Sequence, residues 1–223
     1  MIQEHLEVRR TARYWRDGAE PAEARELFLG LHGHAQLAER FLRDLLPLQD
    51  PVTLVAAPEA LSRFYLETAR TGRHGELIGA TWLTREDRET DLADGYRYLD
   101  LLATHLVSCC PLRPRLTVLG FSQGSLMAAR WLMHSTLAPA RLILWGTPLP
   151  PEVEPEALAS RLSGASVVLV AGDSDPVVPP GTIEANAAAL QAAGLDARAE
   201  RFAGGHFLLR EPLLRAAGRA GTT

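Results

Sequence analysis

The chain has 223 residues, of which 47% are hydrophobic and 22% charged, a size and composition typical of one globular domain. Its formal net charge of −4 at pH 7 gives no basic footprint for nucleic acid or an anionic membrane. The amino terminus is polar and no run approaches the roughly twenty apolar residues of a membrane span. The sequence therefore predicts a single cytoplasmic domain over residues 1–223.

Apolar runs bounded by turn residues alternate with apolar residues at helical spacing. In the first half of the chain these patterns predict one or two strands at 6–15, a strand at 26–31, a helix at 36–46 and a strand at 52–56, followed by a long helix that is capped by Asp87 or Thr90 and ends near 107. In the second half they predict strands at 116–119, 141–145, 167–171 and 196–202. Between these strands they predict helices at 125–134, after 155 and at 182–193. This alternation predicts an α/β fold with a mostly parallel sheet and helices on both faces.

The segment 59–89 is less regular and contains a glycine-rich turn at 72–79. We expect it to pass over the carboxyl edge of the sheet, where α/β enzymes bind their ligands.

The most informative motif is a G-x-S-x-G box, Gly120-Phe121-Ser122-Gln123-Gly124. A predicted strand enters it and a predicted helix leaves it, which is the arrangement of a nucleophile elbow. The elbow would expose Ser122 as a catalytic nucleophile, and the backbone N–H of Gln123 at the helix start would stabilise an oxyanion.

Such a box is common by chance, so a catalytic role for its serine requires an acid and a base further along the chain. Asp175 follows a predicted core strand and is rigidified by Pro176, and His206 follows two glycines after the last strand. Their order along the chain, serine, then acid, then histidine, is the order of an α/β-hydrolase triad. Asp173 is the alternative acid, although its place after Gly172 is typical of a turn.

The loop His32-Gly33-His34-Ala35 follows the strand at 26–31. In α/β-hydrolases the loop after the equivalent strand supplies the second oxyanion donor, so we expect the backbone N–H of His34 to have this role. His32 and His34 could alternatively be metal ligands, but no further ligands follow them. The sequence implies no metal and no cofactor.

The substrate pocket is defined least by the sequence. Aromatic and apolar residues near the predicted carboxyl edge could line an acyl or alcohol site, although core packing explains each of them equally well. These residues are Phe64, Tyr65, Trp82, Trp145 and Leu149. The apolar residues around Trp82, or an exposed edge strand, could also support a homodimer.

Four motifs together resemble one family. They are Leu31-His32-Gly33, the G-F-S-Q-G box at 120–124, the run Gly172-Asp173-Ser174-Asp175-Pro176-Val177-Val178-Pro179, and Gly205-His206. With them the chain resembles the α/β-hydrolase superfamily, and within it the phospholipase/carboxylesterase family that includes the acyl-protein thioesterases. In this chain Ser125 follows the box where the family often has glycine, and His34-Ala35-Gln36 stands where the family often has a second glycine-rich turn.

The resemblance implies a compact, metal-independent serine hydrolase without a large cap domain, active on small to medium carboxylic esters. It implies a triad of Ser122, Asp175 and His206 and an oxyanion hole made by the N–H groups of His34 and Gln123. An acyl thioesterase, a lysophospholipase and a hydrolase-fold protein that binds a small ligand without turnover remain alternatives.

Overall fold

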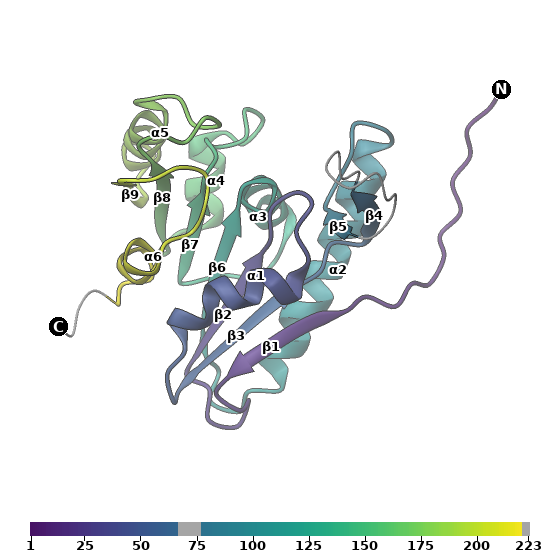
Figure 1. The fold of residues 1–223 in the computed structure, drawn as a ribbon, viewed down its shortest axis with the longest axis horizontal. Helices are drawn as coiled ribbons and strands as arrows, with labels where there is room; N and C mark the ends of the chain where they lie inside the picture. Colours follow the sequence, from purple (N-terminus) through teal and green to yellow (C-terminus); the bar gives the residue numbers. More distant parts are fainter. Residues whose placement is uncertain (67–76, 220–223) are drawn as a thin grey trace.

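The computed structural model describes residues 1–66 and 77–219, so only part of the predicted turn at 72–79 falls within it. The described residues form a seven-stranded sheet in the order β1-β3-β2-β6-β7-β8-β9 (Figure 1). Its strands are β1 (Tyr14–Gly18), β2 (Glu26–Leu31), β3 (Thr53–Pro58), β6 (Arg115–Phe121), β7 (Arg141–Trp145), β8 (Ser166–Gly172) and β9 (Asp196–Phe202). Only β1 is antiparallel to its neighbour among these strands, which confirms the mostly parallel sheet.

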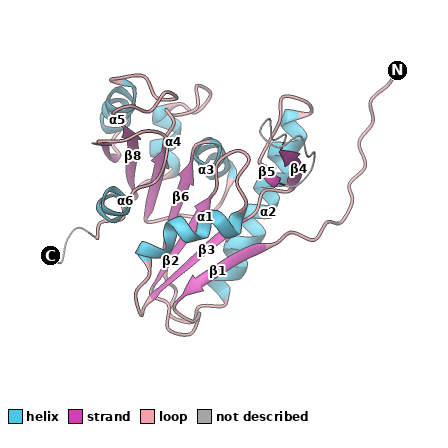
Figure 2. Ribbon diagram, in the orientation of Figure 1, coloured by secondary structure: helices cyan, strands magenta, loops and turns pink. Residues whose placement is uncertain are grey.

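Helices cover both faces of this sheet, as Figure 2 shows. One face packs against α1 (Ala38–Leu45), the 3-10 turn η1 (Leu46–Leu48) and α6 (Arg210–Ala216). The other packs against α2 (Arg88–Ser108), α3 (Gln123–His134), α4 (Pro155–Arg161) and α5 (Thr182–Ala192). Successive side chains of a strand point to opposite faces, and a strand buried on both faces is therefore apolar throughout. The run Val167-Val168-Leu169-Val170 in β8 is fully buried in this way.

The first predicted strand is partly wrong. Residues 1–13 belong to no helix or strand, and only Tyr14–Gly18 pairs with β3. Leu6 and Val8 are 86% and 77% exposed. The apolar residues whose alternation suggested a strand there are therefore not packed against the rest of the protein. An alternating apolar pattern forms a strand only where a neighbouring strand is available to pair with it.

Two features were not predicted from the sequence. A separate two-stranded antiparallel sheet forms from β4 (Ser62–Leu66) and β5 (Leu77–Thr81), within the segment expected to be irregular. A short helix, α6, follows the last strand. Residues 1–66 and 77–219 form no separate cap domain, and none of their helices has the length and apolar character needed to cross a membrane.

Candidate active site

Ser122 lies at the sharp turn between β6 and α3. Its backbone has φ +53° and ψ −121°, a conformation that residues with a Cβ rarely adopt and that is typical of a nucleophile elbow. The Ser122 N–H donates to the carbonyl oxygen of Trp145 at 2.8 Å. A Cβ on Gly120 would clash with the backbone of Ser125, and one on Gly124 would clash with the carbonyl oxygen of Leu31. The two glycines of the box are therefore required by close backbone packing.

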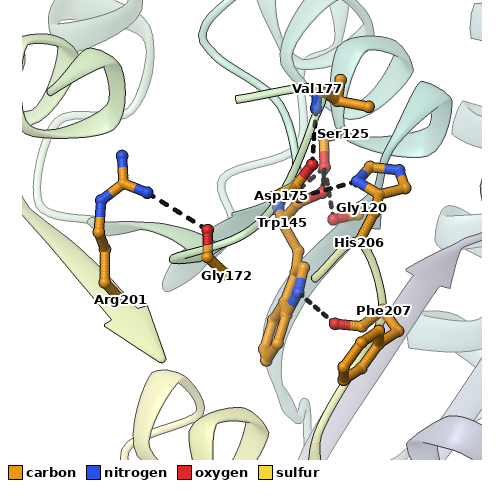
Figure 3. A network of polar contacts seen from close by, with 9 residues as sticks. All are labelled: Gly120, Ser125, Trp145, Gly172, Asp175, Val177, Arg201, His206 and Phe207. Atoms are coloured by element: carbon orange, nitrogen blue, oxygen red, sulfur yellow. Dashed lines mark hydrogen bonds and ion pairs between the residues drawn. The ribbon is translucent and has the colours of Figure 1, made fainter. Parts of the chain in front are cut away.

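Asp175 and His206 are brought together from the loops after β8 and β9. The Nδ1 of His206 lies 2.8 Å from Oδ2 of Asp175 (Figure 3). The Asp175 side chain is only 1% exposed, and its Oδ1 accepts the backbone N–H of Val177 at 2.8 Å. Asp173, the alternative acid, is exposed and makes no ion pair with His206 in the described part of the chain. The geometry favours Asp175 as the partner of the imidazole.

Close backbone contacts hold these two loops together. The Ser174 N–H donates to the Gly204 carbonyl oxygen at 2.8 Å, and a Cβ on Gly172 would clash with that same carbonyl. A Cβ on Gly146, which has φ +74°, would lie 2.9 Å from Cε1 of His206. The imidazole thus sits over the end of β7, against Gly146, whose missing Cβ leaves room for it.

The imidazole also reaches the elbow. The rings of His206 and Phe121, the residue before Ser122, have centroids 4.9 Å apart. Within the described residues the Ser122 hydroxyl makes no hydrogen bond, so its link to His206 is not formed here. Such catalytic hydrogen bonds often shorten only when substrate is bound.

The two expected oxyanion donors are free. Neither the His34 N–H nor the Gln123 N–H has an acceptor among residues 1–66 and 77–219. Their neighbours are fixed: the Gly33 N–H donates to Oε1 of Gln36 at 2.7 Å, and the Ala35 N–H donates to the Ala80 carbonyl at 2.9 Å. Gln123 is the first residue of α3, where an N–H has no partner within the helix.

His32 has a structural place in this loop. It is fully buried, its Nδ1 lies 2.7 Å from the Gly33 carbonyl, and its Nε2 accepts the Ala60 N–H at 3.1 Å. Burial lowers its pKa to about 4, which keeps the ring neutral. Because both ring nitrogens are already engaged, the fold leaves His32 no lone pair for a metal ion.

Two polar side chains that sequence reasoning missed brace the elbow. Oε1 of Gln123 accepts the Trp82 N–H at 3.0 Å, and its Nε2 donates to the Leu83 carbonyl at 2.9 Å. Oγ of Ser125 lies 2.5 Å from the Gly120 carbonyl oxygen and accepts the Trp145 N–H at 2.9 Å, as Figure 3 shows. The departure from glycine at position 125 was visible in the sequence, but its partners depend on the strand beside it.

The five candidate pocket residues are not equivalent. Trp145 is 1% exposed and donates its Nε1–H to the Phe207 carbonyl at 3.1 Å, and Leu149 is also buried. Trp82 is buried and donates its Nε1–H to the His32 carbonyl at 2.8 Å. Trp82 itself therefore offers no exposed surface for a dimer, and a homodimer through the residues around it stays a prediction.

Phe64 and Tyr65 lie on β4, outside the central sheet. The Phe64 ring stacks on the ring of His34 with centroids 5.3 Å apart, and Tyr65 is 69% exposed. A Cβ on Gly79, in the paired strand β5, would lie 2.6 Å from the Ala35 carbonyl oxygen. The β4–β5 hairpin thus packs directly against the loop that carries the His34 N–H.

No protein-family model and no curated protein matches the sequence. Solved structures do match: esterase PE8 is similar at 26% identity, covering 93% of this chain and 96% of that chain, with a TM-score of 0.66. The carboxylesterase of Bacillus cereus is similar at 18% identity over 93% and 92% of the two chains, with a TM-score of 0.68. Acyl-protein thioesterase 2 of Zea mays is similar at 18% identity over 95% and 100%, also with a TM-score of 0.68.

These matches extend over nearly the whole sheet and its helices, and the neighbours also include a phospholipase/carboxylesterase of Dyadobacter fermentans. The chain has the α/β-hydrolase fold, with its mostly parallel sheet and flanking helices.

Proposed function

We propose that the protein is a serine hydrolase that cleaves small to medium carboxylic esters through Ser122, His206 and Asp175. The observation that carries this proposal is the 2.8 Å contact between His206 Nδ1 and the buried Asp175 carboxylate, beside an elbow serine with φ +53°. A carboxylate in this position selects the tautomer in which Nδ1 carries the proton and Nε2 has the lone pair. That lone pair is what a serine hydroxyl needs as its base.

In the proposed reaction, Ser122 Oγ attacks the ester carbonyl carbon while His206 Nε2 takes the hydroxyl proton. The carbonyl oxygen becomes an oxyanion, which the N–H groups of His34 and Gln123 stabilise. The C–O bond to the alcohol then breaks, and His206 returns the proton to the leaving alkoxide. Water, deprotonated by the same nitrogen, attacks the acyl-enzyme and releases the acid and free Ser122.

The same residues would also serve a thioester or a lysophospholipid, because the triad fixes the reaction type and the pocket fixes the substrate. Esterase PE8 and the Bacillus cereus carboxylesterase carry ester-cleaving names, whereas the Zea mays protein is an acyl-protein thioesterase. The greater identity to esterase PE8 favours an ester. The hairpin bearing Phe64 and Tyr65 is our candidate for the acyl-contacting wall, since it adjoins the His34 loop.

The test is a series of p-nitrophenyl esters of increasing acyl length with an acyl thioester beside them. Ser122→Ala should lower kcat by about 10⁵-fold or more, and Ser160→Ala, which changes an exposed serine of α4, should leave it unchanged. A maximum at short or medium chains supports the carboxylesterase, and a preference for the thioester or for long chains supports the alternatives.

Labelling by a fluorophosphonate separates an enzyme from a hydrolase-fold binding protein, because only an activated serine reacts. We expect one label per chain, located on Ser122. A wild-type protein that resists the label and turns over none of the esters would contradict the proposed function.

A further inference from the structure

A polar cavity lies at the amino-terminal ends of the parallel strands, opposite the end that carries Ser122. Its volume is about 100 Å³, several times the space that one water needs. The first residues of three adjacent parallel strands, β2, β6 and β7, line it together with the chain that follows α6. The lining residues are Glu26, Arg115, Thr117, Ala140, Arg141, Ala217, Gly218 and Arg219.

The sheet register explains why the polar residues meet there. Glu26 pairs with Arg115 across β2 and β6, and Thr117 pairs with Arg141 across β6 and β7. Because residues two apart in a strand share a face, Arg115 and Thr117 point to the same side as Leu119 of the α1–α6 core. The cavity thus lies on the sheet face that packs against α1 and α6, at the end of that face where the side chains are polar.

The charges around the cavity are not balanced. Arg219 is neutralised by Glu26 at 2.6 Å and Asp50 at 3.2 Å. Within the described residues, Arg115 and Arg141 make no ion pair. Two unpaired guanidinium groups therefore line one cavity of a chain whose net charge is −4.

Arg141 is held in place with donors to spare. Its Nε donates to Oγ of Ser166 at 3.1 Å and its Nη1 donates to the Ala217 carbonyl, whereas its Nη2 makes no hydrogen bond to a described residue. Burial is the main cause that lowers the pKa of Arg141. Arg198 and Arg115 lower this pKa further, and Glu26 and Asp196 partly oppose them. The guanidinium is thus anchored and partly desolvated with no carboxylate in the described part of the chain bonded to it, and a bound anion would stabilise its charged form.

We propose that this cavity is a binding site for inorganic phosphate, held by Arg115, Arg141 and the Thr117 hydroxyl. Forked guanidinium groups match the oxygens of a tetrahedral oxyanion in pairs, and Thr117 adds a neutral donor. The volume suits one such ion with a few waters. The site is remote from the triad, so it is independent of the proposed esterase reaction.

The experiment is calorimetric titration of the full chain with inorganic phosphate at fixed ionic strength, without ester substrate. We expect saturable binding of one phosphate per chain. Arg115→Ala should weaken it about tenfold or more, as expected for a lost charge-assisted hydrogen bond, and Arg115→Glu should abolish it. Arg115 is exposed, so these variants should fold, and thermal unfolding without phosphate checks this.

The matched control is Arg40→Ala, which removes an exposed arginine of α1 that has no ion pair among the described residues. It should bind phosphate as the wild type does. The proposal is overturned if phosphate does not bind at millimolar concentration, if equal chloride gives the same heat, or if Arg115→Glu binds normally. In the last case Arg141 serves only to cap the end of α6.

Glycerol 3-phosphate is the comparison ligand, since a phosphate group could arrive free or on a larger molecule. Weaker binding of glycerol 3-phosphate than of inorganic phosphate supports the free ion that the cavity volume favours. Tighter binding overturns that assignment and points to an organic phosphate.

Discussion

Ser125 Oγ bridges two strands of the sheet, since it lies 2.5 Å from the Gly120 carbonyl oxygen on β6 and accepts the N–H of Trp145 on β7 at 2.9 Å. The hydroxyl is buried, so its loss would leave the Trp145 N–H without a partner. Ser125→Ala should lower the free energy of unfolding by about 1–3 kcal/mol, the usual cost of an unpaired buried polar group. Urea denaturation measures it.

The matched control for that change is Ser160→Ala on the exposed face of α4, which should stay within about 0.5 kcal/mol of the wild type. Equal stability of the two variants would show that the Ser125 hydroxyl does not support the elbow.

A paired substitution tests the triad acid. Asp175→Asn should lower kcat on an ester by about 10⁴-fold, because the amide favours the wrong imidazole tautomer. Asp173→Asn, two residues away and exposed, should change kcat little. If the Asp173 variant lost activity and the Asp175 variant kept it, the assignment of the acid would be reversed.

The Gln123 side chain offers a test of positioning that keeps the backbone N–H in place. Gln123→Met retains the length but loses the bonds to Trp82 and Leu83. We expect kcat/KM on the best ester to fall about tenfold, since displaced groups near the reacting atoms are costly. Fluorophosphonate labelling should still occur, more slowly.

Gln123→Glu is the conservative variant for comparison. Its carboxylate can still accept the Trp82 N–H, so it should fall between the wild type and Gln123→Met. Wild-type kinetics for both variants would mean that the loop at 81–83 is held by other contacts.

His32 predicts a pH effect on stability. Burial lowers its pKa to about 4 in the folded protein, below the value of about 6.5 for an unfolded chain. Above pH 6.5 both states are neutral at this residue and it contributes no pH dependence. As pH falls from 6.5 towards 4 only the unfolded state takes up the proton, so up to about 3 kcal/mol of stability is lost.

The measurement is urea denaturation at half-unit steps from pH 8 to 4.5, for the wild type and His32→Asn. The variant should be less stable throughout, because it cannot satisfy both partners of His32, but its stability should fall less between pH 6.5 and 4.5. Parallel curves would show that His32 does not titrate on unfolding.

The strands and motifs that sequence reasoning found were those with a local signal. The apolar run 167–171 predicts a strand because a strand buried on both faces is apolar throughout. The G-F-S-Q-G box predicts the elbow because all the residues of that turn are consecutive in the sequence. The position of Asp175 beside His206 followed from their places after parallel strands, which end at the same edge.

The missed features depend on contacts between distant segments. The sequence of β4, Ser62-Arg63-Phe64-Tyr65-Leu66, does not alternate between polar and apolar residues, although its burial alternates once it pairs with β5. The cavity between Arg115 and Arg141 exists only because β6 and β7 are neighbours. The strand predicted around Leu6 and Val8 was wrong for the opposite reason. The local alternation is present there, but these residues pair with no other strand that the structure describes and are exposed.

The β4–β5 hairpin forms its own small sheet and is attached beside the candidate site through Gln123 and the Ala35 backbone. None of its strands pairs with the seven-stranded sheet, so its length and side chains can change without disturbing the order of that sheet. Substitutions on the exposed part of this hairpin, such as at Tyr65, should therefore alter which acyl groups are accepted, provided that Gly79 and Ala80, which contact the Ala35 backbone, are kept.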